Sequence, residues 1–165
     1  MGPSSPKPIA TEPVVLEGEG ATAALGARLA SVLRPGDVVG LRGDLGAGKS
    51  TLARACLRSL AGAAIEVPSP TFTLVQIYDL PACSVWHVDL YRLADPAEVD
   101  ELGLEEALDR AALLIEWPER LPEGAFADRL EIGLRTVDAA HREVRIEAGP
   151  SWQARLSALT GQATD

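Results

Sequence analysis

The sequence is poor in several residue types that specify common functional sites. Its 165 residues include no asparagine, two lysines, two cysteines and two histidines. The longest stretch without a charged residue is residues 67–78, which holds 12 residues and two prolines, whereas a membrane-spanning helix needs about 20 apolar residues. Residues 1–13 carry four prolines and no apolar block, so they match neither a secretory signal nor a helix. We therefore expect a soluble, cytoplasmic protein.

The scarcity of cysteine and histidine argues against a zinc site and a disulfide framework. The sequence contains no CxxC pair, and its histidines, His87 and His141, lie far apart. Cys56 falls on the apolar stripe of a predicted helix, where a small buried thiol is the ordinary explanation. Pairing with Cys83 is the alternative, but we expect no structural disulfide.

Acidic residues exceed basic ones, which gives a formal net charge of -9 and a pI near 4.7. Proteins that bind nucleic acid directly neutralise its phosphates with basic side chains. If RNA is a substrate, we expect a partner protein to hold it.

Residues 43–50 read GDLGAGKS, a complete GxxxxGK[ST] phosphate loop. An apolar run at residues 38–41 precedes the loop, and an apolar helical stripe at residues 52–60 follows it. In that setting the backbone N–H groups and the helix N-terminus bind nucleotide phosphates. We expect Lys49 to reach the β- and γ-phosphates and Ser50 to offer its hydroxyl to Mg²⁺. The alternative is a glycine-rich turn without function.

The pattern of apolar residues predicts strands that alternate with helices. An α/β fold follows: a single P-loop NTPase domain with a central, mostly parallel sheet, antiparallel edge strands and flanking helices. We expect this domain to span residues 14–160, after a disordered leader at residues 1–13 and before a flexible tail at residues 161–165. The predicted strands are residues 14–16, 38–41, 71–79, 84–89, 112–116, 129–137 and 142–148, and the predicted helices are residues 21–32, 52–60, 95–110 and 151–159.

Two acidic residues close predicted strands, and either could complete a magnesium site. Asp89 ends the run Val-Trp-His-Val, and Glu116 ends Leu-Leu-Ile. The carboxyl ends of strands are where α/β sheets gather their ligands. Each acid could instead be a helix cap or a solvated strand end. His87 shares a strand face with Asp89, so it lies near the nucleotide or serves as a packed structural histidine.

A hydroxyl-rich segment at residues 69–73 lies between the loop and Asp89. It reads SPTFT, and Ser69, Thr71 and Thr73 are candidates for a switch that senses Mg²⁺ or the γ-phosphate. A strand entry kinked by proline is the alternative. Trp117, next to Glu116, belongs to the core or covers the mouth of the site, and the sequence does not decide between them.

Two other classes of nucleotide protein remain open besides an ATPase. A conventional GTPase is disfavoured, because guanine is usually selected by an NKxD segment and the chain has no asparagine. A small-molecule kinase is the first alternative, with Arg110, Arg120 and Arg129 as candidate lid residues. The second is a module that binds ATP without turnover.

Four segments together resemble the bacterial TsaE family, ATPases that assist threonylcarbamoyladenosine formation in tRNA. They are GDLGAGKST at 43–51, SPTFTLV at 69–75, HVDLYRL at 87–93 and LIEWPE at 114–119. Many families share the phosphate loop, but all four segments in this order are specific. Segments 19–22 and 98–103 extend the likeness over residues 19–145. Members usually carry Thr where Ser50 stands, which keeps a hydroxyl.

The resemblance implies ATP in the loop, Mg²⁺ held by Ser50 and Glu116, and Asp89 positioned to orient the attacking water. It implies that residues 69–73 form a switch, and that adenine is covered near residues 19–22 and by the hairpin turn at residues 141–142. It also implies action with TsaD and TsaB, of which TsaD transfers the group to the adenosine beside the anticodon. The implied catalytic residues are Lys49 and Asp89, and the implied ATP-binding residues are Glu19, Thr22, Gly43, Asp44, Leu45, Gly46, Ala47, Gly48, Lys49, Ser50, Thr51 and Arg142.

Overall fold

A mixed β-sheet forms the centre of the molecule in the computed structural model, which describes residues 7–68 and 74–161. The described ranges hold eight strands in the order β1-β8-β7-β3-β6-β5-β4, with β2 also paired to β8. Strands β7, β3, β6 and β5 run parallel to one another, with β3 and β6 as the two central strands, and the remaining pairings are antiparallel. The strands are β1 (Ile9–Ala10), β2 (Val14–Glu17), β3 (Val38–Arg42), β4 (Val75–Tyr78), β5 (Ser84–Asp89), β6 (Ala111–Glu116), β7 (Leu130–Thr136) and β8 (His141–Ala148).

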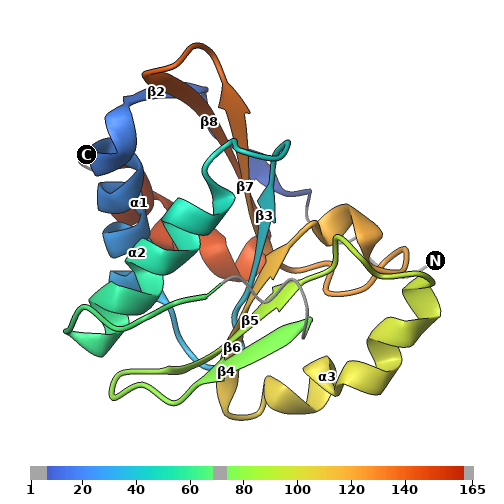
Figure 1. Ribbon diagram of the computed structural model, residues 1–165. Coiled ribbons are helices and arrows are strands. Elements are labelled where there is room, and N and C mark those ends of the chain that lie inside the picture. Colours follow the sequence, from blue (N-terminus) through green and yellow to red (C-terminus); the bar gives the residue numbers. More distant parts are fainter. Residues whose placement is uncertain (1–6, 69–73, 162–165) are drawn as a thin grey trace.

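The central strands are buried on both faces, which explains why they are almost continuously apolar in sequence. Alternate residues of each strand join one of two cores: Val39 and Leu114 pack on one face, Val38 and Leu113 on the other. Helices α1 and α2 lie side by side over the first face (Figure 1). The helical segments are α1 (Gly18–Val32), α2 (Lys49–Ala61), η1 (Pro96–Leu102), α3 (Leu104–Ala107), η2 (Pro118–Arg120), η3 (Pro150–Arg155) and α4 (Leu156–Thr160).

Helices α1 and α2 approach closely at Gly26. A Cβ atom at this position would lie 2.8 Å from both Ala55 Cβ and the Leu52 carbonyl oxygen. Because Gly26 has no side chain, the backbone of α1 packs directly against α2, the helix that follows the phosphate loop.

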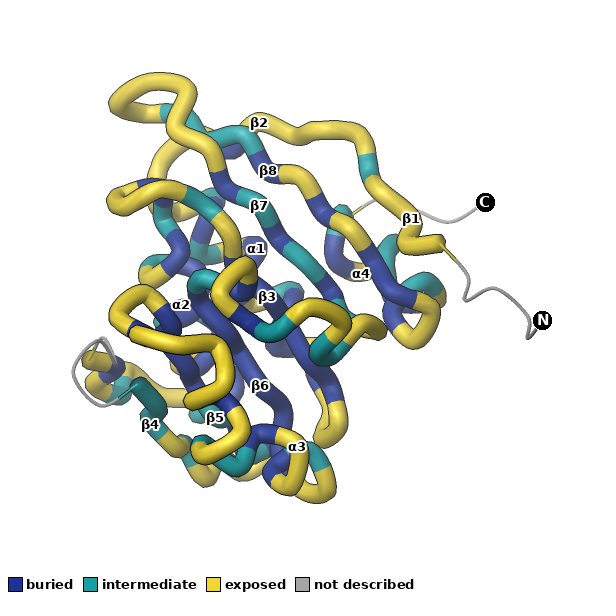
Figure 2. Tube along the Cα trace, turned by 90° about the vertical axis from the view of Figure 1, so that its right-hand side faces the viewer, coloured by how far each residue is buried: buried dark blue, intermediate teal, exposed yellow. Residues whose placement is uncertain are grey.

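Outer strands β7 and β8 alternate between buried and exposed residues, because one face meets the core and the other is open to solvent (Figure 2). Leu130, Ile132 and Leu134 face the core, and the exposed face carries charged residues such as Arg135 and Glu143. The predicted hairpin is confirmed, with Leu134 opposite Val144.

The structure differs from the predicted elements at three places. The helix expected over residues 95–110 is divided into 3₁₀ turns and one short α-helix, because Gly103 takes a left-handed conformation with φ 72°. The last helix begins as 3₁₀ turns at Pro150. The prediction of a leader without regular structure is wrong for Ile9–Ala10, which form strand β1. Strand β8 extends past β2, and β1 pairs with the part of the β8 edge that β2 does not cover.

A buried ion pair joins the C-terminal segment to the turn before β3. The Arg155 guanidinium donates from Nη1 to Asp37 Oδ2 at 2.7 Å and from Nη2 to Asp37 Oδ1 at 2.9 Å. Nη1 also donates to the Val32 carbonyl at 2.8 Å, and the guanidinium lies 3.8 Å from the centre of the Trp152 ring. Arg155 therefore connects the C-terminal segment to residues 32–37, which are more than 100 residues away in sequence.

Both cysteines are free and buried, which confirms the prediction that Cys56 is a buried thiol outside a disulfide. Burial raises the pKa of the Cys56 thiol to about 12. No helix within the described ranges is long and apolar enough to cross a bilayer.

Candidate functional site

The phosphate loop joins β3 to α2 and depends on its glycines. Gly43, Gly46 and Gly48 have φ angles of 148°, 82° and 110°, which side-chain-bearing residues rarely adopt. A Cβ at Gly43 would lie 2.5 Å from the Leu134 carbonyl oxygen. Helix α2 begins at Lys49 without a side-chain cap, so its first N–H groups are available to an anion. The loop therefore has the backbone that phosphate binding requires.

Lys49 is held against the loop and is only 5% exposed. Its ammonium donates hydrogen bonds to the carbonyl oxygens of Gly43 and Asp44, and it lies 3.8 Å from the centre of the Trp117 ring. Burial lowers the pKa of Lys49, while the nearby carboxylates of Glu116, Glu119, Asp89 and Asp44 oppose that shift. A cation buried beside backbone carbonyls and an aromatic face can bind an anion that enters the loop.

Ser50 and Glu116 are brought together by the neighbouring strands β3 and β6, although they are 66 residues apart. The Ser50 hydroxyl donates to Glu116 Oε1 at 3.3 Å. Two adjacent ligands of an octahedral Mg²⁺ ion lie about 3 Å apart, so these two oxygens are close enough to share one cation. Within the described part of the chain, no group of three His, Cys, Asp or Glu side chains forms a metal site.

The second carboxylate oxygen of Glu116, Oε2, is contacted by His87. Its Nε2 lies 2.8 Å from Glu116 Oε2, and the two residues are 1% and 3% exposed. The two roles considered for His87 are therefore compatible: it is a packed, hydrogen-bonded histidine, and it contacts a residue of the site.

Asp89 lies next to Glu116, because it pairs with Glu116 in the parallel register of β5 and β6. The side chain is 6% exposed, and its Oδ1 accepts a hydrogen bond from the Tyr91 backbone N–H at 2.9 Å. Both acids end their strands on the side that meets α2, where the sheet's geometry predicts ligand binding.

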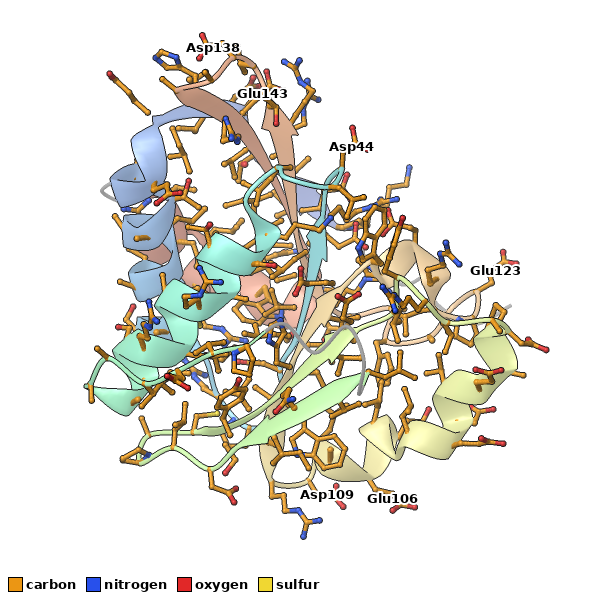
Figure 3. All side chains as sticks on the ribbon, in the orientation of Figure 1. Asp44, Glu106, Asp109, Glu123, Asp138 and Glu143 are labelled. Atoms are coloured by element: carbon orange, nitrogen blue, oxygen red, sulfur yellow. The ribbon has the colours of Figure 1, made fainter. Side chains whose placement is uncertain are left out.

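A cavity of about 390 Å³ lies in front of the loop, lined by Ser50, Asp89 and Glu116. Most of the predicted loop residues line it too; Gly43 and Ala47 do not. Leu45 is 71% exposed beside Asp44, which projects at the tip of the loop (Figure 3).

The sequence reasoning missed part of the cavity wall. Tyr91 and Arg92 line the cavity, and they follow Asp89 directly in the HVDLYRL segment. Trp117 also lines it, with its ring centre 5.0 Å from that of Tyr91, so Trp117 covers the site. Its left-handed backbone, with φ 63°, turns the chain directly after Glu116.

A second, smaller cavity of about 160 Å³ lies on the other side of the loop. It gathers the residues predicted to surround the base, namely Glu19 and Thr22 from α1 and Arg142 from the β7–β8 hairpin. Thr51 lines both cavities. Arg142 is held in place by hydrogen bonds from Nη1 to the carbonyl oxygens of Asp138 and His141. The base-binding role of these residues remains a prediction. The candidate switch residues Ser69, Thr71 and Thr73 lie outside the described residues.

Comparison with known proteins finds one family. A family model described as "Threonylcarbamoyl adenosine biosynthesis protein TsaE" matches residues 16–144. The chain is 40% identical over 129 residues to a Rickettsia felis protein named tRNA threonylcarbamoyladenosine biosynthesis protein TsaE, covering 78% of this chain and 75% of that protein. A Bacillus subtilis protein of the same name is 35% identical over 128 residues, covering 77% and 79%. The crystal structure of Bacillus subtilis YdiB has a TM-score of 0.75 and 28% identity, covering 95% of this chain and 98% of that one.

Proposed function

Because this chain belongs to the TsaE family, we propose that it binds ATP with Mg²⁺ and hydrolyses it to support formation of N6-threonylcarbamoyladenosine in tRNA. The observation that carries the proposal is the 3.3 Å distance between the Ser50 hydroxyl and Glu116, next to a phosphate loop whose following helix has no side-chain cap at its N-terminus. Related proteins are named for this biosynthesis.

The proposed roles of the residues follow from their positions. Backbone N–H groups of residues 43–51 and the Lys49 ammonium bind the phosphates, and Ser50 and Glu116 hold Mg²⁺. The bound metal would neutralise charge on the β- and γ-phosphates. Asp89 accepts a hydrogen bond from the attacking water, whose oxygen bonds to the γ-phosphorus as the link to the β–γ bridging oxygen breaks. ADP and inorganic phosphate are the products.

A kinase is less well supported than an ATPase. The arginines considered for a lid have structural partners: Arg120 donates to the Leu93 carbonyl, and Arg129 pairs with Glu131. Arg110 does not line the cavity either. Analysis of the products decides between the classes, because a kinase moves phosphate to a metabolite and a module without turnover yields no ADP.

We propose that the transfer to tRNA is made by TsaD and TsaB and that this chain resets their complex. The charge of the surface supports this division of tasks. Acidic side chains occur at opposite ends of the molecule, with Asp138 and Glu143 on the β7–β8 hairpin and Glu106 and Asp109 near α3 (Figure 3). The net charge of -9 disfavours direct binding to the tRNA backbone, so tRNA is reached through the partners.

Replacing the two strand-end acids should have different effects. Glu116→Ala removes a metal ligand and should weaken Mg²⁺-dependent ATP binding, whereas Asp89→Ala should leave binding largely intact and lower turnover about 10²-fold or more. Isothermal titration with and without Mg²⁺, together with ADP release, separates the two effects. Glu123→Ala is the matched control, because this acid is exposed and does not line the cavity. Equal loss of metal dependence in the Asp89 and Glu116 variants would contradict the assignment.

Binding to the partners should depend on the nucleotide. A coupled switch requires the ATP and ADP states to bind TsaD–TsaB with different affinity. We expect immobilised TsaD–TsaB to retain different amounts of the chain with ATP, with ADP and without nucleotide, and ADP production to rise in their presence. Equal retention in all three conditions would contradict a nucleotide-dependent switch in partner binding.

A further inference from the structure

The two oxygens of Glu116 have different partners. Oε1 faces Ser50 Oγ at 3.3 Å, and Oε2 faces His87 Nε2 at 2.8 Å. Residues Asp89 and His87 lie on the same face of β5, so the neighbouring strand supplies both the second acid of the site and the histidine that contacts the first. The contact with His87 leaves Oε1 as the oxygen directed toward Ser50.

The surroundings of His87 define which nitrogen carries the proton. The side chain is almost fully buried, and its Nδ1 has no hydrogen-bond partner among residues 7–68 and 74–161. An unpaired N–H in a buried site is costly, and an ionised carboxylate only accepts hydrogen bonds. Hydrogen on Nε2 allows the ring to donate to Glu116 Oε2 over the observed 2.8 Å.

We propose that His87 is a positioning residue that restricts Glu116 to one metal-binding oxygen and thereby favours Mg²⁺ over Ca²⁺. The proposal rests on the proposed function, since it concerns the ion that accompanies ATP. Mg²⁺ requires a near-ideal octahedron of single oxygens at about 2.0–2.1 Å, whereas Ca²⁺ accepts 6–8 oxygens and often binds both oxygens of one carboxylate. A carboxylate with one oxygen already hydrogen-bonded suits the smaller ion.

Substitution of His87 should change metal selectivity more than nucleotide binding. In His87→Leu, Glu116 can rotate and offer both oxygens. The Mg²⁺ concentration that gives half of the metal-dependent ATP binding should rise about 10–100-fold, the usual range for loss of a partner behind a metal ligand. The corresponding Ca²⁺ concentration should rise less, so the ratio of the Ca²⁺ concentration to the Mg²⁺ concentration falls. Affinity for ATP without metal should stay close to that of the wild type, whereas the melting temperature should fall, because Glu116 Oε2 loses its buried hydrogen-bond partner.

Two polar substitutions of His87 test the proposal independently of His87→Leu. In His87→Gln the amide N–H can reach the place of Nε2, so the selectivity of the wild type should be kept. His87→Asn is shorter, cannot reach Oε2, and should behave as His87→Leu does. The Asn and Gln pair decides the question if His87→Leu does not fold, because both members are polar and differ only in reach.

The experiment measures ATP binding by titration calorimetry over a range of Mg²⁺ and of Ca²⁺ concentrations. An unchanged Mg²⁺ requirement in His87→Leu and His87→Asn, an equal loss for both ions, or a Gln variant that matches Asn would each overturn the proposal. Failure of the wild type to bind ATP in a metal-dependent way would instead overturn the proposed function.

Discussion

Lys49→Ala is expected to abolish ATP binding at concentrations that saturate the wild type. Lys49 is 5% exposed and provides the positive charge at the centre of the loop. Removing one partner of a buried charge pair costs about 2–5 kcal/mol, which corresponds to a loss in affinity of roughly 30-fold to several thousand-fold. Titration calorimetry with MgATP measures this loss.

Lys7→Ala is the matched control for this prediction. The chain has only two lysines, and Lys7 is exposed, distant from the loop in sequence and not among the residues that line the cavity. Both variants change the net charge equally, so a general electrostatic effect would appear in both. Unchanged affinity in Lys49→Ala would contradict the assignment of residues 43–50 as a nucleotide-binding loop. Lys49→Arg should also bind poorly, because a planar guanidinium does not replace a compact ammonium against phosphates.

Loss of the Arg155 guanidinium is expected to have the largest effect on stability. Arg155→Met leaves the Asp37 carboxylate buried without its bidentate partner, and breaking a buried pair in this way costs about 3–5 kcal/mol. In a domain of this size 1 kcal/mol shifts the melting temperature by about 2–4 °C, so a fall of roughly 6–20 °C is expected. Thermal unfolding followed by circular dichroism gives the value.

A double variant and a surface variant test the cause of this effect. Asp37→Leu combined with Arg155→Met removes both charges and should cost less than the sum of the single variants. Arg135→Met breaks an ion pair of similar length, 2.9 Å to Glu143, but the Arg135 side chain is 66% exposed. Its melting temperature should match that of the wild type, because water already solvates both charges. Strict additivity in the double variant would show that the pair is not coupled.

The sequence predicted those elements whose signal is local. The apolar run at residues 38–41 and the glycine positions of the loop define β3 and the turn into α2 without reference to the rest of the chain. The alternation along residues 129–137 and 142–148 predicted the hairpin for the same reason, and the structure forms it from residues 130–136 and 141–148. The helix predicted at residues 95–110 was less accurate, because helical periodicity does not distinguish a continuous α-helix from 3₁₀ turns interrupted at Gly103.

The site was only partly predictable, since its parts come from separate strands. The chemistry of Asp89 and Glu116 marked them as candidates, but their adjacency depends on the parallel pairing of β5 with β6. Nothing in the spacing of His87 and Glu116 indicates a 2.8 Å contact, and nothing near Trp117 indicates that it lies over Lys49. These relations depend on strand order, which is a property of the whole sheet.

The class of fold, the phosphate loop and the residue types that could bind a nucleotide and its metal follow from the order of amino acids alone, because backbone geometry and apolar periodicity act over a few neighbouring residues. Which of these residues meet depends on how the whole sheet folds. The pairs that define the molecule, Ser50 with Glu116, His87 with Glu116 and Asp37 with Arg155, are 66, 29 and 118 residues apart. Contacts over such separations form only when the apolar faces of many segments are buried together, so no local pattern in the chain encodes them.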